Sequence, residues 1–158
     1  ALNFLIEKLG KTRALYDSPD GEPTPDRPTR TARTVEVLTT ITGQQRAAII
    51  VIPAQFGRRH RGRSPRRARE VLRSDEFGLG GLGVVSMAAT HPKRFVRWEQ
   101  LHTDCPGDDF ASEPGAVPDR APIWSFAGRR LEFSMSRVGD AYAACGSASG
   151  FLVSAPSE

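Results

Sequence analysis

Two neighbouring segments rich in β-branched residues place the strongest constraint on the fold of this chain. Residues 35–42 read VEVLTTIT and residues 47–53 read AAIIVIP, and a short polar segment separates them. β-Branched residues favour extended strands, and two such runs joined by a short turn are typical of a β-hairpin. Because both faces of the second run are apolar, we expect it to be a central strand that ends at Pro53.

The C-terminal third of the sequence predicts a second group of strands. Apolar and polar residues alternate around position 133, which puts Leu131, Phe133 and Met135 on one face of a strand. The small residues 146–150, GSASG, are expected to form a tight hairpin turn. The segments that we expect to be strands are residues 123–126, 130–135, 141–145 and 151–153.

Capping signals predict where helices begin and end. Ser64 followed by Pro65 is a favourable helix start, and Ser74 followed by two acidic residues is expected to start the next helix. His91-Pro92 should end that second helix. The helical segments expected are residues 2–9, residues 65–73, the glycine-rich residues 77–90 after the Ser74 start, and a short amphipathic piece at 93–101.

This order of elements predicts an α+β fold. We expect a mostly antiparallel sheet, with an N-terminal helix and two or three central helices packed on it. A chain of 158 residues fits a single domain, residues 1–158. Residues 17–33 are rich in proline and polar groups and predict a surface loop or linker, whereas residues 57–73 predict an arginine-rich loop and helix.

Composition narrows the cellular setting and the classes of partner. No apolar run approaches the roughly 20 residues of a membrane span, so we expect no membrane partner. The two cysteines, Cys105 and Cys145, make neither a disulfide framework nor a metal-binding CxxC pair. This usage is typical of reduced thiols in a cytoplasmic protein, although a bond between the two thiols stays possible on the sequence alone.

The arginine block at residues 58–73 is the most unusual feature of the sequence. It carries eight arginines and His60 against a single acid, Glu70. The mutual repulsion of these arginines favours a counter-charge, either nucleic-acid phosphate or an acidic protein surface, which includes the acidic residues 17–26 of this chain. A solvated arginine-rich loop without a partner is the third interpretation. The predicted polyanion-binding residues are Arg58, Arg59, Arg61, Arg63, Arg66, Arg67, Arg69 and Arg73.

The glycine string at residues 78–83 matches the GxGxxG pattern of dinucleotide-binding loops. That fingerprint requires a strand that ends directly in the turn, and the residues before Gly78 have a helical pattern. Close packing of a helix is therefore the favoured interpretation of these glycines, and we expect no cofactor.

Residues 102–109 concentrate titratable side chains and are the weaker alternative for a functional site. His102, Asp104 and Cys105 are the candidate catalytic residues, because a thiol nucleophile requires a histidine within reach. Asp104, Asp108 and Asp109 are the candidate metal ligands. The spacing matches neither a calcium loop nor a zinc site, and a polar turn around Pro106-Gly107 is the favoured interpretation of the segment.

These features favour a non-catalytic basic protein that acts through polyanion or protein contacts, for example as an accessory or structural component of a nucleoprotein assembly. Two alternatives remain open. One is a small hydrolase or metal-dependent enzyme that uses the His102–Asp108 loop, and the other is a protein-binding module such as an immunity or antitoxin partner.

Overall fold

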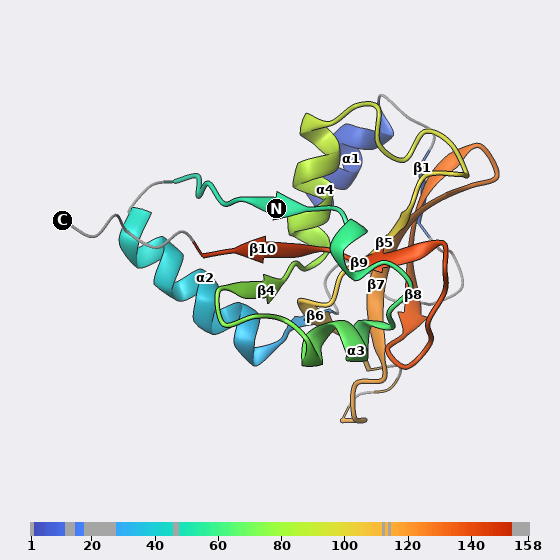
Figure 1. Cartoon of the computed structure of the whole chain (residues 1–158). Helices are drawn as coiled ribbons and strands as arrows, with labels where there is room; N and C mark the ends of the chain where they lie inside the picture. Colours follow the sequence, from blue (N-terminus) through green and yellow to red (C-terminus); the bar gives the residue numbers. More distant parts are fainter. Residues whose placement is uncertain are drawn as a thin grey trace.

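The computed structural model describes residues 2–11, 15–17, 28–45, 48–111, 113 and 115–152. These residues form an α+β fold, as the sequence predicts (Figure 1). The helices are α1 (Leu2–Gly10), α2 (Ala32–Gln45), the 3-10 helix η1 (Arg58–His60), α3 (Pro65–Glu70) and α4 (Gly81–Thr90). The strands are β1 (Leu15–Asp17), β2 (Thr29–Arg30), β3 (Ala54–Gln55), β4 (Glu76–Gly78), β5 (His102–Asp104), β6 (Asp108–Asp109), β7 (Arg120–Ala127), β8 (Arg130–Arg137), β9 (Cys145–Ser147) and β10 (Ser149–Phe151).

The larger sheet of the described part of the chain has the strand order β1-β8-β7-β5-β9. Its centre is the predicted hairpin β7–β8, in which Gly128 takes a positive φ of 55° at the turn. Trp124 and Phe133 face each other across this hairpin, with ring centroids 4.6 Å apart, and both are buried. They form the core together with apolar side chains of α1, α2 and α4. The alternation read from the sequence therefore identified the correct core face.

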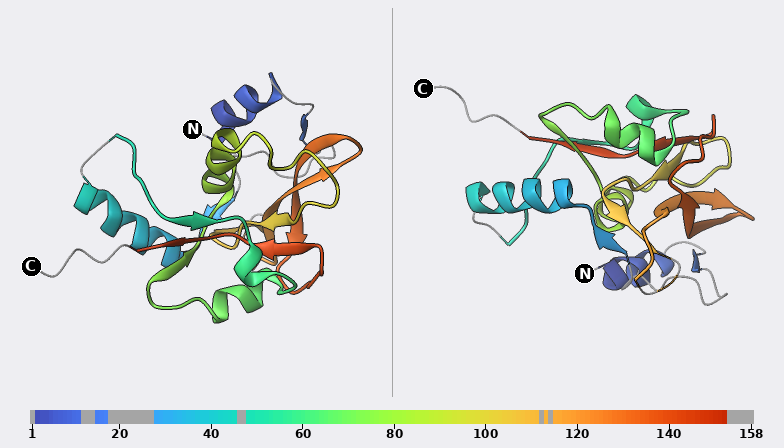
Figure 2. Two further views of the ribbon diagram at one scale, coloured as in Figure 1. Left: turned by 45° about the horizontal axis from the view of Figure 1, so that its top comes forward. Right: turned by 90° about the horizontal axis from the view of Figure 1, so that it is seen from below.

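The smaller sheet has the strand order β3-β10-β4. It is connected to the larger sheet through the continuous segment that contains β9 and β10. Residues 146–150 form no hairpin turn: β9 pairs with β5, whereas β10 pairs with β3 and β4. Ala148 lies between them, donates its amide to Asp104 O and accepts from Leu79 N. The right-hand view of Figure 2 places η1 and α3 on one side of β10, and α1 and α2 on the other.

The predicted hairpin at residues 35–53 is wrong. Residues 35–42 belong to α2, where Val37 and Ile41 are buried four residues apart, and Thr31 Oγ1 accepts from Thr34 N at the helix start. The segment before β3 is no central strand, because Ile49 and Val51 are 78% and 75% exposed. Burial against β4 outweighs the modest strand preference of β-branched residues, which is strongly context-dependent.

Helix predictions succeed where the cap is local. The helices α1 and α3 are confirmed, and Ser64 Oγ accepts from Arg67 N as expected for an N-cap. The start at Ser74 is wrong, because residues 76–78 form strand β4 and α4 begins only at Gly81. Residues 93–101 form turns and bends rather than a helix.

Two segments predicted as loops are partly strand. Residues 102–104 form β5, whereas the turn predicted around Pro106-Gly107 is present. Residues 102–108 are all buried, so this turn lies in the interior rather than on the surface. In the proline-rich segment, residues 29–30 form β2 and α2 starts at Ala32, whereas residues 18–27 lie outside the described part of the chain. None of the described helices is both long and apolar enough to cross a bilayer.

Two glycines let η1 approach the larger sheet closely. Gly57 has a φ of 100°, and a methyl group on its Cα would collide with the carbonyl of Gly146 in β9. We expect Gly57→Ala to destabilise the protein more than Gly62→Ala, whose φ of 75° carries a similar backbone penalty without a neighbour within 4 Å. The control should cost about 1–2 kcal/mol, and Gly57→Ala roughly 1–3 kcal/mol more because of the collision. Urea denaturation measures both, and equal losses would mean that the close approach carries no energetic weight.

Candidate arginine surface and adjoining pocket

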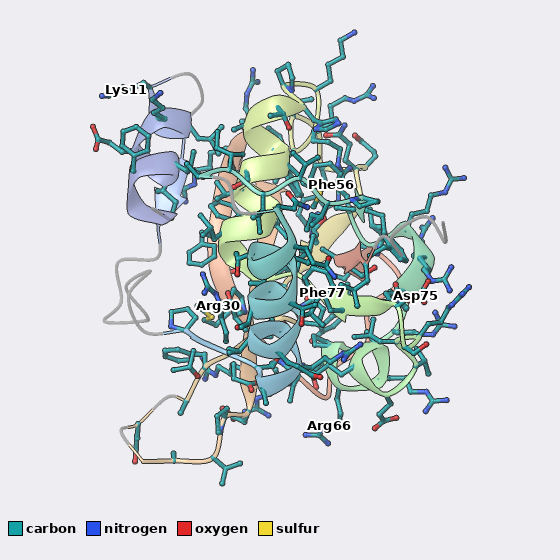
Figure 3. The ribbon with its side chains drawn as sticks, turned by 90° about the vertical axis from the view of Figure 1, so that its left-hand side faces the viewer. Lys11, Arg30, Phe56, Arg66, Asp75 and Phe77 are labelled. Atoms are coloured by element: carbon teal, nitrogen blue, oxygen red, sulfur yellow. The ribbon has the colours of Figure 1, made fainter. Side chains whose placement is uncertain are left out.

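The structure divides the arginine block into two sets of side chains. Seven of the eight are exposed, and only Arg69 is half-buried. The six exposed arginines on η1, on the loop that follows it and on the first turn of α3 are called the outer arginines: Arg58, Arg59, Arg61, Arg63, Arg66 and Arg67. Figure 3 shows Arg66 projecting from the molecule, whereas Phe77 lies in its interior. Arg69 and Arg73 instead line a pocket. The predicted loop and helix are thus both present, and they present different surfaces.

Four of the outer arginines are held in place by single nitrogens. Arg59 Nε donates to Glu76 Oε2 at 3.2 Å, and Arg61 Nε donates to the carbonyl of Ala143 at 3.0 Å. Arg63 Nη1 donates to the carbonyl of Arg59, and Arg67 Nη1 pairs with Glu70 at 2.8 Å. The side chains of Arg58 and Arg66 make no hydrogen bond to the described residues. A guanidinium has five N–H donors, so each tethered arginine keeps donors for a ligand.

The buried carboxylate of Glu76 holds η1 against β4. Glu76 in β4 is fully buried, and its Oε1 accepts from His60 Nε2 at 2.8 Å and from Ser149 Oγ at 2.6 Å. Its Oε2 accepts from Arg59. Burial raises the pKa of Glu76, but the hydrogen bonds from Ser149 and His60, with the charges of His60 and Arg59, outweigh it and bring the pKa below the ordinary value. Glu76 is therefore an ionised buried anchor.

Arg69 joins α3 to the segment that follows β5. Its Nε donates to the carbonyl of Pro106 at 2.9 Å and its Nη2 donates to the carbonyl of Asp108 at 2.8 Å. The same nitrogen pairs with Asp109 at 2.8 Å. Most donors of this half-buried side chain are therefore used inside the protein, which gives Arg69 a structural role in addition to any ligand contact.

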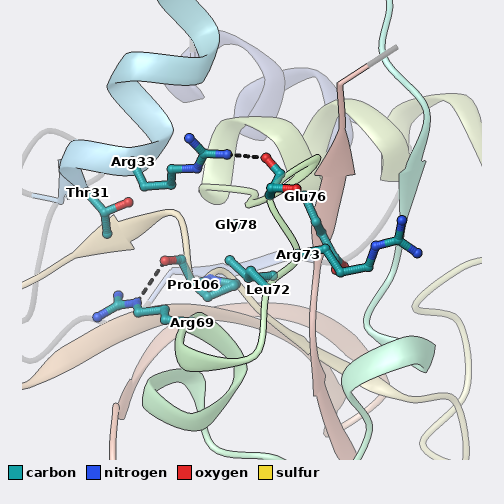
Figure 4. Close-up of a pocket in the computed structure, with 9 residues that line it drawn as sticks. Thr31, Arg33, Arg69, Leu72, Arg73, Glu76, Gly78 and Pro106 are labelled. Carbon is teal, nitrogen blue, oxygen red and sulfur yellow. Dashed lines mark hydrogen bonds between the residues drawn. The ribbon is translucent and has the colours of Figure 1, made fainter. Parts of the chain in front are cut away.

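A pocket of about 460 Å³ lies between the start of α2, the end of α3 and β4. Leu72, Pro106 and the backbone of Gly78 line it, together with Arg33, Arg69 and Arg73 at its edges. In Figure 4, Arg33 extends across the top of the hollow, where its Nη2 donates to the carbonyl of Ser74, and the guanidinium groups of Arg69 and Arg73 lie towards opposite sides. Ligand pockets of proteins have volumes of this order, with apolar walls and few polar groups.

Sequence reasoning missed the α2 side of this pocket. The sequence places Thr31 and Arg33 in a proline-rich surface loop, whereas both residues line the pocket. Thr31 directly precedes α2, and recognition of its cap would have placed Arg33 in the first turn of a helix. No signal in the sequence links Arg33 to Arg73, because the two are joined only by the packing of α2 against β4.

The glycine string does follow a strand, contrary to the sequence interpretation. β4 ends at Gly78 and α4 begins at Gly81, which is the strand–turn–helix order of a phosphate-binding loop. However, Asp108 Oδ2 accepts from Gly81 N at 2.7 Å, so a carboxylate already occupies the start of α4. Burial raises the pKa of Asp108 despite this hydrogen bond. Asp108 is therefore a helix cap, placed where a phosphate would otherwise bind.

The candidate catalytic residues lie along β5 and just after it. His102 and Asp104 share one face of the strand, and the ring of His102 contacts Trp98 at 4.8 Å between centroids. Burial lowers the pKa of His102, whereas burial raises the pKa of Asp104 to about 6 despite a hydrogen bond from Ser136 Oγ. Cys105 is completely buried, and burial raises the pKa of its thiol well above the ordinary value.

The candidate metal ligands have other partners within the protein. Asp104 accepts from Ser136, Asp108 caps α4 and Asp109 pairs with Arg69. Among the described residues, no three His, Cys, Asp or Glu side chains are grouped so that they could hold a metal ion. Cys105 and Cys145 are both free and buried.

Comparisons with protein-family models, with curated proteins and with solved structures give no significant match to this chain.

Proposed function

We propose that this protein binds a polyanion without catalysis, through the outer arginines. The observation that carries the proposal is that four of these exposed side chains are fixed by one nitrogen each and keep their remaining donors. A side chain that is already ordered loses less conformational entropy on binding, so preorganisation strengthens each contact. Arg59 and Arg61 are bound through Nε, which leaves both Nη groups of each for a ligand.

The phosphate backbone of a nucleic acid is the partner that we propose. Guanidinium forks match phosphate oxygens in geometry and charge, and contacts to phosphate require no base recognition. Residues 58–67 contain no Phe, Tyr or Trp, and the ring of His60 is buried, so this segment offers no ring on which a base could stack. Binding with little sequence preference is therefore favoured. An acidic protein surface carries similar charges, and it is the rival that the experiment must separate.

The test compares two triple variants that remove the same charge from different places. Arg58→Ser, Arg66→Ser and Arg67→Ser remove three outer arginines, whereas the matched control removes three exposed cations of α1 and of the segment after α4: Lys8, Lys93 and Arg97. The formal net charge falls from +4 to +1 in both, since each loses three cations. Fluorescence anisotropy with a labelled duplex oligonucleotide is measured over a series of salt concentrations.

We expect the first variant to bind the duplex weakly. The slope of the logarithm of the binding constant against the logarithm of the salt concentration should fall in magnitude by about 2 to 3, because each lost phosphate contact contributes about 0.9. The control should keep most of the slope. Equal losses in both variants would show that binding depends only on net charge. Failure of the unmodified protein to bind nucleic acid at low salt would leave the acidic-protein partner as the better explanation of the arginine surface.

A further inference from the structure

We propose that the nucleic acid bound by the outer arginines is single-stranded, and that its unpaired bases stack on the exposed rings of Trp98 and Tyr142. The inference rests on the proposed function, because it adds base contacts to the phosphate contacts of the outer arginines. Trp98 is 60% exposed and Tyr142 is 54% exposed. Exposed rings beside exposed cations are the combination with which proteins bind single strands.

Tyr142 stands in a turn to which an outer arginine is attached. Arg61 Nε donates to the carbonyl of Ala143 at 3.0 Å, and Cys145 N donates to the carbonyl of Tyr142 at 2.9 Å, which closes the turn. The hydroxyl of Tyr142 donates to Asp140 Oδ2 at 3.2 Å and restricts the ring. The cation and the ring are therefore attached to adjacent residues, just as a phosphate and its base are neighbouring groups of one nucleotide.

Trp98 adjoins the same turn through His102. The backbone N–H of His102 donates to the carbonyl of Ala144 at 2.9 Å, and its buried ring contacts the Trp98 ring edge-to-face, with 4.8 Å between centroids. Such a contact involves at most one face of the indole, so the other face is available to a base. Figure 1 shows β5 and β9 side by side, with η1 close to β9. Both rings therefore adjoin the arginine surface.

The segment that carries Trp98 is held in one conformation without regular secondary structure. The side chain of Gln100 accepts from Val96 N at 2.8 Å and donates to the carbonyl of Lys93 at 2.7 Å. Phe95 is buried and has a positive φ of 54°, which is rare for a bulky residue. Backbone strain of this kind persists where the surroundings impose it, and it clusters at ligand sites. An indole that is already fixed loses less entropy when a base stacks on it.

The experiment measures binding of the full chain to three labelled DNA probes of equal length by fluorescence anisotropy. The probes are a thymidine single strand, an abasic single strand that carries the phosphates without bases, and a duplex whose bases are paired. We expect the thymidine strand to bind at least about fivefold more tightly than the abasic strand, because each stacked base contributes at least that factor.

Intrinsic fluorescence reports on Trp98 directly. The chain has two tryptophans, and Trp124 is fully buried in the core. Quenching of tryptophan fluorescence by an unlabelled thymidine strand, but not by the abasic strand, is therefore the expected signature of a base stacked on Trp98.

Two variants and a matched control connect binding to the rings. Trp98→Ala and Tyr142→Ala should each weaken binding to the thymidine strand at least about fivefold. Binding to the abasic strand and to the duplex should not change, nor should the salt dependence, because neither variant removes a cation. Trp98→Phe keeps a ring and should restore most of the affinity. The control is Phe4→Ala, which removes a 58% exposed ring of α1, on the opposite side of β10 from η1 (Figure 2).

The proposal is overturned if the thymidine and abasic strands bind equally, or if the ring variants bind as Phe4→Ala does. A ring variant that also loses the abasic strand acts through the fold and counts against stacking; thermal unfolding identifies that case. In each of these outcomes, binding that still depends on the outer arginines leaves the proposed function intact. Failure of the unmodified protein to bind any probe overturns both.

Discussion

Replacing Glu76 with alanine should lower the free energy of unfolding by about 3–5 kcal/mol, the cost of removing one partner from a buried charged network. The change leaves His60, which is 2% exposed, without its partner at Nε2, and it leaves Ser149 Oγ without an acceptor. It also releases Arg59 from the position in which Glu76 holds it. Urea denaturation followed by circular dichroism gives the free energy directly.

The control for this prediction is Glu70→Gln, which breaks the exposed pair between Arg67 and Glu70. Pairs of that kind contribute at most about 1 kcal/mol, so the control should be nearly neutral. Because the pKa of Glu76 is lowered in the folded state, its contribution is complete above the pKa of the unfolded chain and is lost as the pH falls through the lower folded pKa. An effect of Glu76→Ala no larger than that of Glu70→Gln would show that the buried network does not hold η1.

Replacing Asp104 with asparagine should stabilise the protein at neutral pH. Burial raises the pKa of Asp104 from 3.8 to about 6, so between these two pH values the folded state holds a proton that the unfolded chain has released, and at neutral pH the buried carboxylate is charged. The stabilisation is therefore full below the unfolded pKa and is lost as the pH rises through about 6. The complete loss corresponds to about 3 kcal/mol, and the asparagine, which stays neutral, should recover up to this amount.

The pH dependence itself supplies the control for Asp104→Asn. The two proteins should differ most above pH 7, and the difference should shrink towards pH 4, where the carboxyl is protonated in the folded state. The amide oxygen of asparagine can still accept from Ser136 Oγ, so the hydrogen bond is retained. A difference that is constant across this range would mean that packing of the side chain, rather than its ionisation, determines the effect.

The sequence predicted those parts of the fold whose information is local. Strands β7 and β8 were found because Leu131 and Phe133 alternate with polar residues within one hairpin. Helix α3 was found because Ser64 and Pro65 mark its start. Residues 35–42 were wrongly predicted as a strand because their sequence is compatible with both structures. Their β-branched side chains favour a strand, while Val37, Leu38 and Ile41 share one face of a helix.

The candidate site was also predictable only where its information is local in the sequence. Exposure of the outer arginines follows from their charge, and the sequence located all of them. Their attachments to Glu76 and to the carbonyl of Ala143 depend on pairing between segments far apart in the chain, which no local pattern encodes. The pocket depends on α2, which the sequence assigned to a strand, so Arg33 could not be placed beside Arg73.

Ala148 gives the molecule a property that neither sheet has alone. Its amide is bonded to Asp104 in the larger sheet, while its carbonyl accepts from Leu79 at the end of β4, so one buried residue belongs to both. Neither sheet can open at this point without breaking the hydrogen bonds of the other. We therefore expect amide hydrogens of β5, β9 and β10 to exchange with solvent only in a common opening event, as a single cooperative unit.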